Sequence, residues 1–251
     1  MTRRGTNPPL QRLRGGETVS CVWLSLGSVA LAEIAAEFSP DMIVFDGQHG
    51  LWERTTLHAA ILSAGETSTP VVRVAANSTH LIGEALDSGA LGVIVPLVED
   101  ASQAAAAVAA AHYPPRGNRS GGGVRPLSNF SEYSQSCATH VMVSVMIETE
   151  LGLANAAEII ATPGIDMVFI GSGDLALSLG TVGPIGLEDA IQQLLRLCRL
   201  CGVPCGIFTA SAEDARDRLS EGFAFVVAED DIRLARNGIA SSLSAVRKEM
   251  R

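Results

Sequence analysis

The chain has 251 residues, a length typical of one large α/β domain. Hydrophobic residues make up 47% of the chain and aromatic residues only 4%, so an aliphatic core is expected. The formal net charge of −9 argues against nucleic acid or an anionic membrane as the main partner. No segment approaches the roughly 18 uninterrupted apolar residues of a transmembrane helix, so we expect a cytoplasmic protein.

Residues 1–17 show no pattern of a buried element. The basic residues near the N-terminus are not followed by an apolar stretch, so no secretory signal is expected. The pairs Pro8-Pro9 and Gly15-Gly16 are typical of turns. We therefore expect residues 1–17 to form a surface arm and residues 18–251 to form a single domain.

Short apolar runs alternate with amphipathic or alanine-rich stretches along the rest of the chain. The predicted strands are residues 19–26, 42–45, 71–74, 93–95, 141–147, 167–170, 205–208 and 225–228. The predicted helices are residues 30–38, 55–64, 81–88, 101–111, 154–161, 187–200, 212–219 and 232–248. Roughly eight successive βα units predict a (β/α)8 TIM barrel, with an open doubly wound sheet as the alternative.

One long interruption runs from Tyr113 to about Phe130, after the helix that follows the fourth strand. It contains Pro114-Pro115 and three consecutive glycines from Gly121. Because it is longer than an ordinary connection, a functional or interface role is favoured.

The five cysteines do not resemble a secreted disulfide framework. Cys198, Cys201 and Cys205 are close in sequence, but Cys198 falls in a predicted helix, Cys201 lies at its end, and no histidine or fourth cysteine lies nearby. We expect buried, reduced thiols rather than a zinc site.

Two acidic residues follow predicted buried strands. Glu148 comes directly after residues 141–147, and Asp174 follows residues 167–170 and a Gly-Ser-Gly segment. Carboxylates at the carboxyl ends of neighbouring parallel strands meet at the mouth of the fold, and hard cations prefer such oxygen ligands. The alternative is that each residue only caps the helix that follows.

The turn after the second predicted strand contains Asp46 and His49. The carboxylate could orient the imidazole ring and support a proton shuttle, or Asp46 could simply stabilise the turn. Arg73 interrupts the third apolar run and needs an anionic partner if it is buried. That partner could be a structural carboxylate or the carboxylate or enolate of a substrate.

The segment from Gly171 to Asp174 opens a further predicted helix, residues 175–179, where backbone N–H groups could face an anion of carboxylate size. It matches neither a P-loop nor a dinucleotide fingerprint, so no organic cofactor is expected.

These residues resemble those of the HpcH/HpaI family of metal-dependent, class II pyruvate aldolases, from about Val19 to the final helix. The resemblance rests on Ala32-Glu33-Ile34, Asp46-Gly47-Gln48-His49-Gly50, Val72-Arg73-Val74, Leu86-Asp87-Ser88-Gly89-Ala90, Val95-Pro96, Tyr113-Pro114-Pro115 with Gly117 and Arg119, Ile147-Glu148-Thr149, and Gly171 with Asp174-Leu175. It implies a barrel whose C-terminal helix is swapped between subunits, in a hexamer built from dimers.

The resemblance also implies a divalent metal, typically Mg²⁺, Mn²⁺ or Co²⁺, held by Glu148 and Asp174. It implies that His49, paired with Asp46, is the acid/base residue. It further implies that Arg73 holds the 2-oxo and enolate oxygen.

Two further parts of the site follow from the resemblance alone. Gly173 and Asp174 would offer backbone N–H groups to the substrate carboxylate. Asp87 would approach the active site of a neighbouring subunit.

Four positions depart from the commonest pattern of the family. Gln48, Met146 and Ser120 stand where Glu, Gln and Gly are more usual, a combination similar to a subgroup that accepts hydroxypyruvate as well as pyruvate. Ser172 replaces the usual Pro beside the carboxylate pocket. The metal ligands are retained, so altered donor preference is expected rather than loss of activity.

The expected activity is that of a lyase that makes or breaks a carbon–carbon bond between a 2-oxo acid enolate and an aldehyde. No lysine lies at the predicted strand ends, which disfavours a Schiff-base mechanism. The alternatives are a lyase acting on a CoA thioester or forming citrate on the same scaffold, and a non-catalytic 2-oxo acid binding protein. The partners expected are the two small molecules and further copies of the chain.

Overall fold

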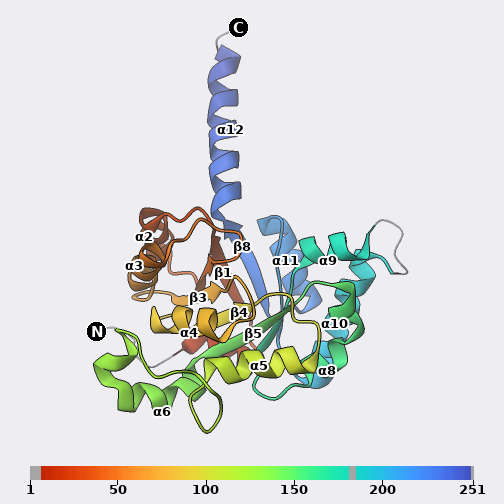
Figure 1. The fold of residues 1–251 in the computed structure, drawn as a ribbon. Coiled ribbons are helices and arrows are strands. Elements are labelled where there is room, and N and C mark those ends of the chain that lie inside the picture. Colours follow the sequence, from red (N-terminus) through yellow and green to blue (C-terminus); the bar gives the residue numbers. More distant parts are fainter. Residues whose placement is uncertain (1–6, 181–184, 250–251) are drawn as a thin grey trace.

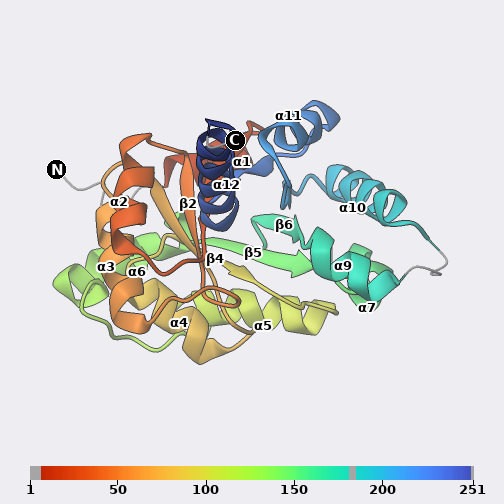
Figure 2. The ribbon, with the colours of Figure 1, turned by 90° about the horizontal axis from the view of Figure 1, so that it is seen from above.

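The computed structural model describes residues 7–180 and 185–249. Its strands are all parallel to their neighbours and close into a barrel in chain order, with β1 pairing both β2 and β8 (Figures 1 and 2). The TIM-barrel prediction is confirmed and the open sheet is wrong. The strands are β1 (Val19–Leu24), β2 (Met42–Asp46), β3 (Thr69–Arg73), β4 (Gly92–Val95), β5 (Met142–Ile147), β6 (Met167–Ile170), β7 (Cys205–Ile207) and β8 (Phe225–Asp230).

Helices surround the barrel and connect successive strands (Figure 2). They are α1 (Pro8–Arg14), α2 (Val29–Glu37), α3 (Arg54–Ala64), α4 (Thr79–Asp87), α5 (Ala101–Ala111), the short 3₁₀ helix η1 (Pro126–Asn129), α6 (Phe130–His140), α7 (Glu150–Ala154), α8 (Ala156–Ile160), α9 (Ser172–Leu179), α10 (Leu187–Cys201), α11 (Ala212–Glu221) and α12 (Asp231–Glu249).

Strands β2 to β6 are buried along their whole length, because one face of each packs inside the barrel and the other packs under helices. The interior includes an aromatic group in which Phe169 contacts both Trp23 and Phe225, with ring centroids 5.6 and 5.8 Å apart. Valine, leucine, isoleucine and alanine dominate the outer layer between strands and helices. The core is therefore mainly aliphatic, as its composition predicts.

The N-terminal segment is not a surface arm, and that prediction is wrong for residues 8–14. They form α1, which begins at a capping Asn7 that accepts the N–H of Leu10. Leu10 and Leu13 are fully buried and belong to the cluster that fills the barrel interior. Their spacing of three places both on one face of the helix.

Polar contacts fix α1 at the amino ends of the strands. The Asn7 amide donates to the carbonyls of Leu91 and His140, which come just before β4 and β5, at 3.0 Å each. Arg12 pairs with Asp41 before β2, and Arg14 pairs with Asp166 before β6. The helix therefore closes the amino end of the barrel.

The predicted interruption after α5 contains structure that its polar sequence does not indicate. Between Tyr113 and Phe130 it holds a loop and η1, and it leads directly into α6, which was not predicted. The buried guanidinium of Arg119 organises this segment: it donates to Asp87 at 2.7 Å and to the Tyr133 hydroxyl at 3.0 Å, and it stacks on the rings of Tyr113 and Tyr133.

All five cysteines are free thiols. Cys201 is exposed, because the last turn of α10 reaches solvent, so the prediction of burial is wrong for this residue.

The last helix, α12, rises from the end of β8 and extends away from the barrel (Figure 1). It carries large apolar side chains that are exposed on this single chain, namely Ile232, Leu234, Ile239, Leu243 and Val246. Within the described residues, no helix combines the length and the apolar character needed to cross a bilayer.

Candidate active site

The carboxyl ends of the central strands carry the charged residues singled out in the sequence. Asp46 and Arg73 are the last residues of β2 and β3 and lie opposite each other in the strand register. Glu148 follows β5, and Asp174 lies in the first turn of α9 after β6, the strand paired with β5. The barrel therefore gathers these four residues at one mouth.

Asp46 and Arg73 form a buried ion pair. Nε of Arg73 donates to one carboxylate oxygen of Asp46 at 2.8 Å, and Nη2 donates to the other. The guanidinium carbon lies 5.1 Å from the centre of the Trp23 ring, whose N–H is 3.4 Å from Asp46. The Ser25 hydroxyl donates to the same carboxylate at 3.3 Å.

The pKa of the Asp46 carboxyl lies below its ordinary value. Burial by itself raises this pKa, but the hydrogen bonds and positive charge of Arg73, together with two backbone hydrogen bonds, outweigh burial. The backbone N–H groups of Gln48 and His49 also donate to Asp46, at 3.0 and 3.1 Å, and lower its pKa further. Asp46 therefore stabilises its turn, as one of the two interpretations of the sequence proposed.

The predicted side-chain pair of Asp46 and His49 does not form. The carboxylate contacts the backbone N–H of His49, while the imidazole is exposed and has no hydrogen bond to the described residues. The reason is the register of β2 and β3, which places Arg73 directly beside Asp46. The partner of Arg73 is therefore a carboxylate of the protein itself.

Glu148 is buried, with 1% of its surface exposed, and only one of its oxygens is satisfied. Oε1 accepts the N–H of Leu97 at 2.7 Å, whereas Oε2 has no partner among the described residues. Burial raises the pKa of this carboxyl, and the negative charge of Asp174 raises it further. Glu148 does not cap α7, because Thr149 does.

Leu97 was not identified from the sequence, yet its backbone holds Glu148. Its φ of 55° lies in the left-handed region, which a bulky residue adopts at a cost of about 1–3 kcal/mol. This conformation accompanies the hydrogen bond from its N–H to Oε1 of Glu148. No local sequence pattern marks such a residue.

The surroundings of Oε2 and Asp174 fit a divalent cation. A Cβ atom at Gly171 would lie 2.4 Å from Oε2, so glycine leaves space that a side chain would fill. Asp174 adds a second, partly buried carboxylate, and the two acidic groups provide hard oxygen donors. Among residues 7–180 and 185–249, no cluster of three or more His, Cys, Asp or Glu side chains could hold a metal. The protein would thus supply two ligands.

The remaining predicted residues occupy different places. Met146 is buried in the barrel interior, and its methyl group lies beside Gly171. Gln48 is half-buried beside Asp46, and Ser172 starts α9 with its hydroxyl 3.4 Å from the carbonyl of Phe208. Gly173 is exposed in the first turn of α9.

Asp87 is the one predicted catalytic residue that the chain does not bring to this site. It ends α4, the helix that leads from β3 to the amino end of β4, and it pairs with Arg119. Its predicted contact with another subunit stays a prediction.

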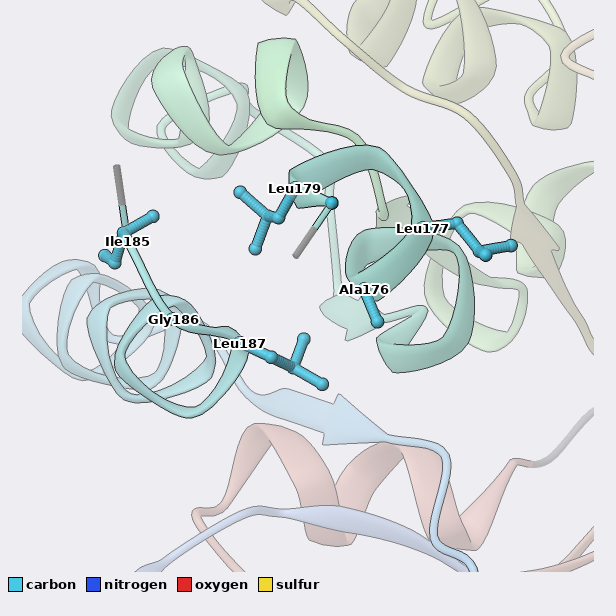
Figure 3. A pocket seen from close by; sticks show the side chains of 7 residues that line it. Ala176, Leu177, Leu179, Ile185, Gly186 and Leu187 are labelled. Atoms are coloured by element: carbon cyan, nitrogen blue, oxygen red, sulfur yellow. The ribbon is translucent and has the colours of Figure 1, made fainter. Parts of the chain in front are cut away.

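Two cavities lie outside this cluster of charges. One of about 420 Å³ separates α9 from α10, and its described lining is apolar, including Leu179, Ile185 and Leu187 (Figure 3). A second, of about 600 Å³, lies between α3, α4 and α6. Neither is lined by Glu148, Asp174, Arg73 or Asp46.

The buried ion pair predicts a specific response to pH. Asp46→Asn should lower the free energy of unfolding by about 3–5 kcal/mol at pH 7, because it leaves Arg73 buried without its counter-charge. Since folding lowers the pKa of Asp46, its stabilising contribution is complete above the unfolded value of about 3.9 and is lost as pH falls through the folded value. Urea unfolding between pH 7 and pH 3 should show this acid-dependent loss in the wild type and a smaller loss in the variant.

The matched control for stability at pH 7 is Asp100→Asn at the start of α5, where asparagine caps a helix as well as aspartate does. Equal stability of the wild type and Asp46→Asn would show that the pair does not stabilise the fold.

A model of the HpcH/HpaI aldolase/citrate lyase family matches residues 19–237. The chain is 33% identical over 249 residues to the hydroxypyruvate/pyruvate aldolase of Delftia acidovorans, covering 96% of this chain and 93% of that protein. It is 34% identical to the 5-keto-4-deoxy-D-glucarate aldolase of Salmonella arizonae, covering 86% of this chain and 87% of that protein.

A solved structure agrees with these sequence matches. The crystal structure of a HpcH/HpaI aldolase/citrate lyase family protein from Burkholderia cenocepacia is 34% identical and has a TM-score of 0.89. The match covers 96% of this chain and 100% of that one. This chain therefore belongs to the HpcH/HpaI aldolase/citrate lyase family.

Proposed function

We propose that this chain is a metal-dependent class II aldolase, which forms or cleaves the bond between the enolate of pyruvate or hydroxypyruvate and an aldehyde. The observation that carries the proposal is the buried Oε2 of Glu148, which has no hydrogen-bond partner among the described residues and is close enough to Asp174 and Arg73 to be affected by both charges. The aldolase names of the relatives support the reaction class.

Glu148 and Asp174 would hold Mg²⁺, Mn²⁺ or Co²⁺. When bound, the cation supplies Lewis-acid polarisation of the keto group of the 2-oxo acid. With only two protein carboxylates as ligands, such a cation could also bind a 2-oxo acid and water. Backbone N–H groups of Gly173 and Asp174, at the start of α9, would face the substrate carboxylate.

Arg73 would stabilise the negative charge that develops on the enolate oxygen. Nε and Nη2 donate to Asp46, which fixes the plane of the guanidinium and leaves Nη1 without a partner among the described residues. Trp23 covers the guanidinium and limits its contact with water. A fixed, partly dehydrated cation stabilises developing charge without reorganising first.

His49 would move the proton at the methyl carbon of pyruvate. Its imidazole is exposed at the mouth of the barrel, so it can exchange protons with solvent. Asp46 would position this ring through the backbone N–H of His49 and not through the ring itself.

A Schiff-base aldolase is disfavoured by the lysine content of the chain. Lys248 is the only lysine, and it lies near the end of α12, far along the chain from the strand ends. Among the described residues of the mouth, none specifically favours a CoA-dependent or citrate-forming lyase, or a binding protein without activity.

We also propose that the protein is a homo-oligomer in which α12 packs against another subunit, as in the swapped hexamer that the family resemblance implies. The apolar residues Ile232, Ile239, Leu243 and Val246 share one side of the helix and are exposed on a single chain. In such an assembly, Asp87 would approach a neighbouring mouth.

The metal proposal predicts that EDTA abolishes aldol cleavage and that Mg²⁺, Mn²⁺ or Co²⁺ restores it. Glu148→Gln and Asp174→Asn should each weaken Mn²⁺ binding by at least the roughly 10–100-fold that loss of an outer ligand partner costs. Calorimetric titration with Mn²⁺ in the absence of substrate measures this directly. The control is Glu150→Gln, an exposed neighbour on α7 that should bind Mn²⁺ normally. Full activity after chelation, or a pyruvate imine trapped by borohydride, would contradict the proposal.

The proposed role of His49 predicts that His49→Ala still binds metal and pyruvate. Exchange of solvent deuterium into the pyruvate methyl group should fall by about 10²–10⁴-fold, the usual contribution of a general acid or base. NMR measures the exchange rate, and the exposed His80 provides the control variant His80→Ala. An unchanged rate in His49→Ala would remove this residue from the mechanism.

The assembly proposal predicts that charges on the apolar side of α12 separate the subunits. The double variant Ile239→Asp, Leu243→Asp should have a smaller mass by light scattering at micromolar concentration, because charged side chains resist burial. Ser241→Asp, on the opposite side of the helix, should leave the mass unchanged. A monomeric wild type would rule out the oligomer.

A further inference from the structure

Asp231, the first residue of α12, is buried with 2% of its surface exposed. Its carboxylate accepts hydrogen bonds from the backbone N–H groups of two residues that follow β1. Ser25 N–H lies 2.9 and 3.0 Å from the two oxygens, and Leu26 N–H lies 2.8 Å from one of them. No ion pair to Asp231 occurs in the described part of the chain. Asp231 therefore holds in place, through these hydrogen bonds, the two residues that follow β1, which we call the β1 turn (Ser25 and Leu26).

Ser25 connects the carboxylate of Asp231 to the ion pair between Asp46 and Arg73 in the candidate active site. Its hydroxyl donates to Oδ2 of Asp46 at 3.3 Å, and its carbonyl accepts the N–H of Leu51 at 2.7 Å. The same oxygen of Asp46 receives Nη2 of Arg73. Two hydrogen bonds thus lead from Asp231 through Ser25 to Asp46.

The position of Asp231 is fixed independently of the β1 turn. Arg233, two residues later, donates to the carbonyls of Thr209 and Ala228 at 3.0 and 3.3 Å. It also pairs with Glu229 at 2.6 Å. These contacts tie the first turn of α12 to β8 and to the segment that follows β7, so Asp231 can hold the β1 turn against a rigid support.

We propose that Asp231 is a positioning residue of the active site, which fixes Ser25 and thereby the Asp46 carboxylate against Arg73. This inference rests on the proposed function for its catalytic consequence, because Arg73 is the group that would meet the enolate. An ionised carboxylate only accepts hydrogen bonds and so suits two converging N–H donors. An asparagine amide would place an N–H₂ group against one of them.

The test compares Asp231→Asn with Asp41→Asn in a Trp52→Phe background. Asp41 also accepts a backbone N–H of β1, from Ser20 at 3.0 Å, but at the opposite end of the strand. The background leaves Trp23 as the only tryptophan, and this ring touches both Arg73 and Asp46. Its emission reports on the pair without any need for activity.

We expect Asp231→Asn to shift Trp23 emission and to lower kcat by about 10–100-fold, as small misplacements of reacting groups do. Pyruvate KM should change far less. Asp41→Asn should lose stability in urea and keep wild-type emission and kcat. Adding Ser25→Ala to Asp231→Asn should lower kcat little further, because both changes break the same path.

Wild-type kcat and emission in Asp231→Asn would overturn the inference, as would equal effects in Asp41→Asn. A wild-type protein without aldol activity would instead refute the proposed function. In that case the emission of Trp23 alone decides whether Asp231 positions the pair.

Discussion

The buried ion pair between Asp46 and Arg73 is the constraint from which the arrangement of the barrel mouth follows. Either charge alone would cost several kcal/mol to remove from water, so the two must lie together. The register of β2 and β3 achieves this. Because Asp46 pairs with Arg73, Gln48 and His49 contact the Asp46 carboxylate only through their backbone N–H groups. The ring of His49 faces solvent.

The pair also determines the charge that remains at the mouth. Arg73 neutralises Asp46, so ionised Glu148 and Asp174 leave two negative charges uncompensated by any cation that contacts them in the described residues. Burial of Glu148 makes that state unfavourable, which its raised pKa expresses. A divalent cation has the charge needed to balance the two carboxylates, and the absence of a side chain at Gly171 lets Oε2 of Glu148 lie against the backbone there.

The sequence predicts those features that depend on local pattern. Continuous apolar runs predict the buried strands, and the residues directly after them predict the contents of the mouth. The helix α1 was missed because its proline and glycine pairs suggest turns, although the spacing of Leu10 and Leu13 indicates a buried face. The helix α6 was missed because its sequence is mostly polar.

Contacts between segments that are distant in the chain could not be predicted from local sequence patterns. The preference of Asp46 for Arg73 over His49 depends on how two strands align, and no spacing within either strand reveals it. Leu97 and Asp231 act through backbone N–H groups, which every sequence contains. Such residues become visible only when the partners 51 and 206 positions away are in place.

The closed amino end of the barrel has a consequence for the order in which substrates bind and products leave. Leu10 and Leu13 fill that end, and the charged residues of the candidate site lie at the opposite end, so reactants would approach them from the mouth at the carboxyl ends. In the proposed reaction, the 2-oxo acid would bind deepest, against Glu148, and the aldehyde would then cover it. Both reactants would enter and leave through the same mouth, so their order would be compulsory. The acid would bind before the aldehyde in synthesis, and the aldehyde would leave before the acid in cleavage.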